Sequence, residues 1–137
     1  MVLLLLTFFL LYGGLHLYFF VKVHAAFAPG GPLQILIVLL LILGLLAPII
    51  VRVSERYGYE ALAGLMSWTG YLWMGCLLLF SAAALVLDLG RLLVHLGSLV
   101  VSADVGRFLP SARMLFLVPL AAALVAGGYG FFEARQI

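Results

Sequence analysis

Five polar side chains are spaced so that they could form one small site beside a membrane. Asp88, Arg91 and His95 occur at i, i+3 and i+7, which places them on one side of any helix that continues through this stretch. His16 lies in the later half of an apolar segment, and His24 follows that segment. If successive apolar segments run antiparallel, all five side chains lie toward the same membrane face. Cationic side chains at such a face are typical of head-group or phosphate binding.

The alternative interpretation of the same residues is purely structural. In that case they anchor helix ends, and Asp88 and Arg91 make an ordinary i,i+3 contact of a few tenths of a kcal/mol. His16 is the most informative of the five, because a polar ring inside an apolar segment needs a hydrogen-bond partner. A bond from His16 to a neighbouring helix is the simpler explanation. Both interpretations stay open on sequence grounds.

The sequence favours neither a cofactor nor a catalytic centre in these residues. Haem ligation requires two histidines at matching depth on facing helices, and only His16 lies clearly inside an apolar segment. Cys76 is the only cysteine, so a transition-metal cluster is not indicated. The motifs G-x-S-x-G, P-loop and H-E-x-x-H are missing. We therefore expect no cofactor, metal ligand or catalytic residue here, while membership of a larger enzyme stays open.

Four apolar stretches must position these residues. They lie near 2–21, 33–51, 61–89 and 114–132, and each is about as long as the roughly 20-residue helix that crosses a bilayer. The first is interpreted as a retained helix, since no basic residue precedes it and it exceeds the roughly 7–15 apolar residues of a signal peptide. Between the last two, residues 90–113 mix charged and apolar residues, and we predict an interfacial segment there.

Composition supports one all-α transmembrane domain over residues 1–137, an integral membrane four-helix bundle. The chain is 67% hydrophobic and 9% charged, whereas soluble domains carry about 25% charged residues. The net charge of +2 without a basic run excludes nucleic acid as an expected partner. We expect a prokaryotic cytoplasmic membrane and, with four crossings, both termini on one side. Lysine and arginine are too evenly divided between the two sides to give the orientation.

Small residues indicate where helices could approach one another closely. Ala122, Ala126 and Gly130 are spaced four apart, which puts them on one stripe of the last helix. Four glycines of the first and third segments are expected to serve the same purpose, namely Gly13, Gly14, Gly70 and Gly75.

Three aromatic and glycine-rich segments together carry a resemblance to a known family. They are Tyr12-Gly13-Gly14-Leu15-His16-Leu17-Tyr18, Gly70-Tyr71-Leu72-Trp73-Met74-Gly75 and Tyr129-Gly130-Phe131-Phe132-Glu133-Ala134-Arg135. In this order the chain resembles the N-terminal membrane region of membrane-anchored calcineurin-like metallophosphoesterases. The resemblance implies a following soluble domain with two metal ions that hydrolyses phosphoesters. That domain's D-x-H and G-N-H-[DE] motifs do not occur in these 137 residues, so no family ligand is assigned here.

Three functions are therefore compatible with the sequence. The first is a membrane anchor and assembly module like the one that precedes a metallophosphoesterase domain. The second is a small accessory subunit that packs against other membrane proteins or a second copy. The third is a lipid- or quinone-binding bundle that uses the polar site. Membrane lipid is an expected partner in all three.

Overall fold

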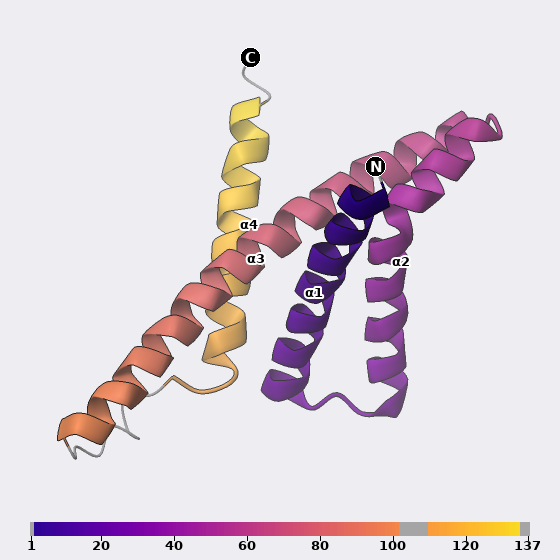
Figure 1. Ribbon diagram of the computed structural model, residues 1–137. Helices are drawn as coiled ribbons and strands as arrows, with labels where there is room; N and C mark the ends of the chain where they lie inside the picture. The colour runs from indigo at the N-terminus through magenta and orange to yellow at the C-terminus, as the bar shows by residue number, and fades with distance from the viewer. Residues whose placement is uncertain (1, 102–109, 135–137) are drawn as a thin grey trace.

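The protein is an all-α chain of four long helices (Figure 1). The structure, a computed structural model, describes residues 2–101 and 110–134. Over these residues no strand occurs, which confirms that the fold is all-α, as predicted. The helices are α1 (Val2–Phe27), α2 (Gly31–Arg56), α3 (Glu60–Val101) and α4 (Met114–Ala134).

The first three helices extend further than predicted. α1 ends at Phe27 rather than near residue 21, α2 at Arg56 rather than near 51, and α3 at Val101 rather than near 89. Hydropathy marks where side chains become polar, whereas backbone hydrogen bonding continues until a residue breaks it. Residues 90–101 of the predicted interfacial segment are thus the last turns of α3. Residues 102–109 lie outside the described residues, and an interfacial position stays a prediction.

Two short turns close the first three helices into antiparallel neighbours. Ala28 takes a left-handed φ of 41°, and its N–H bonds to the carbonyl of His24 (2.9 Å), which ends α1. Pro32 follows in the first turn of α2, where its missing N–H leaves no bond unmade. After α2, Gly58 has a φ of 78°, and Tyr59 N–H reaches back to the carbonyl of Ser54 (2.9 Å). Glycine adopts this φ without a steric penalty.

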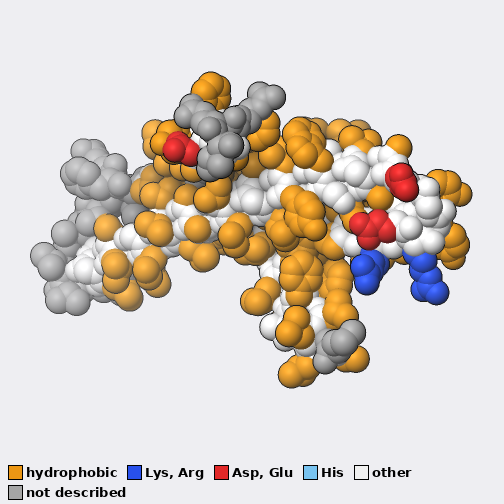
Figure 2. Space-filling view, turned by 90° about the horizontal axis from the view of Figure 1, so that it is seen from above, with side chains coloured by type: hydrophobic (Ala, Val, Ile, Leu, Met, Phe, Trp, Pro, Cys, Tyr) orange, Lys and Arg blue, Asp and Glu red, His pale blue; other side chains and the backbone are white. Residues whose placement is uncertain are grey.

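All four helices are long and apolar enough to cross a membrane, judged by length and composition. Many large aliphatic side chains are exposed along them, for example Leu36, Leu78 and Leu124. Figure 2 shows a mainly hydrophobic face, with acidic and basic side chains gathered at the end where α2 turns into α3. An outer surface of this kind is unfavourable in water and favourable in lipid.

The longest helix, α3, connects the other elements. Its 42 residues extend about 63 Å at about 1.5 Å per residue, roughly twice the apolar thickness of a bilayer. It runs diagonally past the α1–α2 hairpin and α4 in Figure 1. α3 packs against each of the other three helices, whereas α2 and α4 do not contact each other in the described residues.

An aromatic cluster holds α1, α3 and α4 together. The ring of Phe19 on α1 lies edge-on to Phe80 of α3 (centroids 4.8 Å apart) and to Phe116 of α4 (5.7 Å). Phe80 is 1% exposed, and Ala84 and Ala123 are buried in the same cluster. Edge-to-face rings contribute about 0.5–1.5 kcal/mol beyond the area they bury.

The face of α4 that packs within the chain is not the predicted small-residue stripe. Ala122, Ala126 and Gly130 are exposed. The buried residues of α4 are Leu115, Phe116, Pro119 and Ala123. Adjacent helix positions point about 100° apart, so a shift of one residue from Ala122 to Ala123 selects a different face.

Of the predicted packing glycines, Gly70 lies at a close helix crossing. A Cβ placed there would lie 3.1 Å from the Cβ of Ala47, so α2 and α3 approach closely at this point. A Cβ on Gly13, Gly14 or Gly75 would meet no described neighbour within 4 Å. These three positions have open space beside them within this chain.

Candidate functional site

The first polar cluster begins with a hydrogen bond that α2 cannot make for itself. Pro48 lacks an N–H, so the carbonyl of Gly44, four residues earlier, has no helical donor. The hydroxyl of Tyr12 on α1 donates to this carbonyl (3.1 Å). Tyr12 is 4% exposed, and a carbonyl left unpaired in an apolar environment is costly. The contact therefore satisfies two buried groups at once.

His16 extends the cluster to α3. The indole N–H of Trp73 donates to Nε2 of His16 (3.0 Å), so Nε2 must be unprotonated. Nδ1 of the same ring lies 2.8 Å from the carbonyl oxygen of Tyr12 and donates to it. This pair of contacts describes a neutral imidazole whose proton is on Nδ1. Both ring nitrogens are used for helix contacts.

Gly44 makes this three-helix junction sterically possible. A Cβ at Gly44 would lie 2.5 Å from Nε1 of Trp73 and 3.3 Å from Nε2 of His16. No side chain fits at that distance without displacing the indole. The cluster of Tyr12, His16, Gly44 and Trp73 is hereafter called the histidine junction.

The second polar cluster joins the later parts of α1 and α3. The hydroxyl of Tyr18 donates to Oδ2 of Asp88 (2.6 Å), and the ammonium of Lys22 forms a salt bridge with Oδ1. The same ammonium lies 5.5 Å from the centroid of the Tyr18 ring. The Lys22 side chain is 11% exposed and that of Asp88 is 35% exposed, so the pair is partly shielded from the surroundings. We call Tyr18, Lys22 and Asp88 the aspartate cluster.

The structure brings together three of the five residues predicted for the interfacial site. Asp88, Arg91 and His95 line one hollow on α3, together with Leu92. His24 is exposed near the end of α1, and no described contact joins it to that hollow. His16 belongs to the histidine junction, where it contacts Trp73. The predicted grouping is therefore divided between two places.

Several members of the two clusters did not belong to the polar site predicted from the sequence. One signal was available, because Pro48 follows Gly44 by four residues and so marks a carbonyl in need of a donor. Tyr18 and Lys22 are also four apart, which places them on one face of α1. Their common partner is Asp88 on α3, and no nearby sequence pattern predicts that it contacts α1.

Metal-binding and reactive groups are sparse in the described ranges, 2–101 and 110–134. No group of three or more His, Cys, Asp or Glu side chains converges there as a metal ion would require. Cys76 is a free, half-buried cysteine. The chemistry visible in the two clusters is hydrogen bonding and ion pairing between helices.

Comparison with known proteins adds no further identification, since no family model, curated protein or solved structure matches this chain.

Proposed function

We propose that this chain is an integral membrane module that anchors and assembles a partner or a fused domain at the membrane surface. The observation that carries the proposal is how the polar side chains inside the apolar helices are used. His16 bonds to Trp73, and Lys22 bonds to Asp88, so these groups join α1 to α3. Such contacts stabilise helix packing in lipid, where an unpaired polar group is costly.

The outer surface supports the same proposal. Exposed aliphatic side chains line all four helices, as expected for contact with lipid tails. The start of α1 and the end of α4 point toward the same end of the molecule in Figure 1. Four crossings would then leave both termini on one side of the membrane. Any domain attached to either end would be held at that face.

The resemblance to metallophosphoesterase membrane regions gives the proposal a specific form. In that form the anchored partner is a two-metal phosphoesterase domain, encoded in the same frame or separately. Reading the coding frame beyond residue 137 tests it directly. A D-x-H motif soon downstream is the expected result, and a stop codon with no phosphoesterase partner would leave only the general anchor.

Anchoring itself is tested with a soluble fluorescent protein fused after residue 137. We expect the fusion to sediment with membranes and to resist extraction by alkaline carbonate. A matched control fuses the same reporter to α1 alone, which lacks the α3 partners of its polar residues and should be held less stably. Release of the full-length fusion by carbonate would contradict membrane integration.

A second candidate, an accessory subunit or homo-oligomer, is favoured by the exposed position of Ala122, Ala126 and Gly130. A stripe of small residues facing outward allows another helix to approach closely. Chemical cross-linking in native membranes, followed by sizing in mild detergent, separates a monomer from an assembly.

A further inference from the structure

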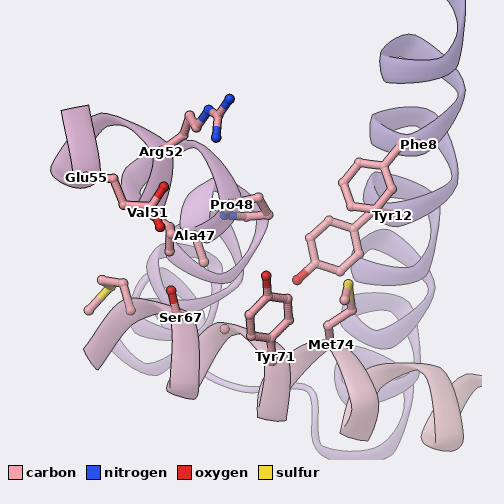
Figure 3. Close-up of a pocket in the computed structure, with 12 residues that line it drawn as sticks. Phe8, Tyr12, Ala47, Pro48, Val51, Arg52, Glu55, Ser67, Tyr71 and Met74 are labelled. Carbon is pink, nitrogen blue, oxygen red and sulfur yellow. The ribbon is translucent and has the colours of Figure 1, made fainter. Parts of the chain in front are cut away.

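A groove lies between α1, α2 and α3, near the α2–α3 turn (Figure 3). Tyr12 of the histidine junction lines it, whereas no residue of the aspartate cluster does. The volume of the groove is about 470 Å³, within the roughly 300–1,000 Å³ typical of ligand pockets. Pro48 explains why it exists, because a proline inside a helix produces a bend. The part of α2 after Pro48 turns to run beside α3 and leaves a space next to Phe8 of α1.

The groove changes from apolar to charged along its length. Phe8, Pro48 and Met74 supply an apolar wall. Toward the end of α2 the lining becomes Arg52 and Glu55, both exposed. Figure 3 shows the hydroxyls of Tyr12 and Tyr71 directed toward the space between these two regions. A ligand with an apolar part and a polar head matches this gradient.

The charged side chains near the end of α2 indicate which polar group the groove could bind. Arg52 and Glu55 are three residues apart on α2, yet they form no ion pair with each other, and neither pairs with another side chain in residues 2–101 or 110–134. A simple anion would meet repulsion from Glu55, and a neutral head would leave Arg52 unmatched. A zwitterion that carries both a phosphate and a cation satisfies both side chains.

We propose that this groove binds a phospholipid with a phosphoethanolamine head group. The phosphate lies against the guanidinium of Arg52, which suits its fork of donors. The primary ammonium donates hydrogen bonds to the carboxylate of Glu55, and an acyl chain begins along Phe8 and Met74. A quaternary choline head has no N–H to donate, so the groove distinguishes ethanolamine from choline lipids. The inference depends on membrane insertion but not on an anchoring role.

The test uses the full chain in nanodiscs made from equal parts of phosphatidylethanolamine, phosphatidylcholine and phosphatidylglycerol. Lipid retained after transfer to detergent is measured by native mass spectrometry. We expect phosphatidylethanolamine to be enriched over the other two. Arg52→Gln and Glu55→Gln should each reduce that enrichment about fivefold, the effect of one surface charge on lipid binding.

Matched controls are Arg56→Gln and Glu60→Gln, which lie at the same turn but do not line the groove. Both should retain the wild-type lipid pattern. Ser67→Phe fills part of the groove without altering a charge, and it should abolish the enrichment of phosphatidylethanolamine. This variant keeps the test decisive if Arg52→Gln fails to fold.

Equal retention of all three lipids, or full enrichment in Glu55→Gln, overturns the inference. Phosphatidylglycerol retained as well as phosphatidylethanolamine also overturns it, because the groove would then recognise only phosphate. A chain that resists carbonate extraction but enriches no lipid refutes this site and leaves the anchor proposal intact.

Discussion

The hydroxyl of Tyr12 on α1 supplies the carbonyl of Gly44 on α2 with the hydrogen bond that its own helix does not provide. Pro48 removes that donor and at the same time bends α2 beside the groove. Pro48 is thus linked to a helix bend, an interhelix hydrogen bond and a cavity. The tyrosine and the proline should therefore behave as a pair.

Tyr12→Phe should lower the free energy of unfolding by about 1 kcal/mol, because the Gly44 carbonyl loses the hydroxyl that donates to it. In a Pro48→Ala background the helix can supply its own N–H to Gly44, so the cost of Tyr12→Phe should fall toward zero. Unfolding in mixed detergent micelles gives the free energy of unfolding of the wild type, the two single variants and the double variant, which together form a double-mutant cycle. An equal cost in both backgrounds would mean that the proline and the tyrosine are not coupled.

Gly44→Ala should destabilise the chain by about 1–3 kcal/mol, the usual cost of overpacking. Its new methyl group would lie 2.5 Å from Nε1 of Trp73 and would disturb the bond to His16. Gly14→Ala is the matched control, because a methyl group there meets no described atom within 4 Å. The control should be neutral or slightly stabilising, since alanine favours helix. Tryptophan fluorescence of the two variants reports the displacement of Trp73 when both are made in a Trp68→Phe background, because Trp68 is the other tryptophan of the chain.

Asp88→Asn should lower stability by about 1–3 kcal/mol, because the Lys22 ammonium is left shielded without a counter-charge. The double variant Lys22→Met with Asp88→Asn should recover part of this loss. Arg56→Gln serves as the control, since Arg56 is an exposed charged residue outside the aspartate cluster. Thermal unfolding in detergent ranks the three. If the double variant is less stable than Asp88→Asn, the pair does not act as described.

Ala123→Leu should destabilise the fold, because Ala123 is 2% exposed and packs against α3 near Phe80. Ala126→Leu changes an exposed position and should leave the stability of the monomer unchanged. If the exposed stripe packs against another copy, Ala126→Leu should instead shift the oligomer toward monomer. Size-exclusion chromatography with light scattering measures this shift. Equal destabilisation by both substitutions would contradict the observed face of α4.

The number, order and approximate position of the helices follow from hydropathy alone. A run of about 20 apolar residues in lipid forms a helix, because a helix pairs its backbone N–H and C=O groups within the segment. The rotation of each helix does not follow. Ala122 and Ala123 are equally small and apolar, so composition cannot choose which one faces α3. Only the packing of Phe116 and Pro119 decides it.

The candidate site shows the same division. A buried partner for His16 was predictable, because a polar ring in an apolar segment requires one. The identity of that partner as Trp73 was not predictable. Trp73 is 57 residues from His16 in the sequence, and their contact depends on the relative depth and rotation of α1 and α3. The pairing of Lys22 with Asp88 is likewise visible only in the structure.

The separation of Lys22 and Asp88 by 66 residues also has a consequence for biogenesis. A ribosome completes α1 well before it has made the Asp88 carboxylate that pairs with Lys22. Until α3 has been synthesised, Lys22 lacks the carboxylate that it contacts in the folded chain. The ion pair between α1 and α3 can therefore form only after about two thirds of the chain has been translated.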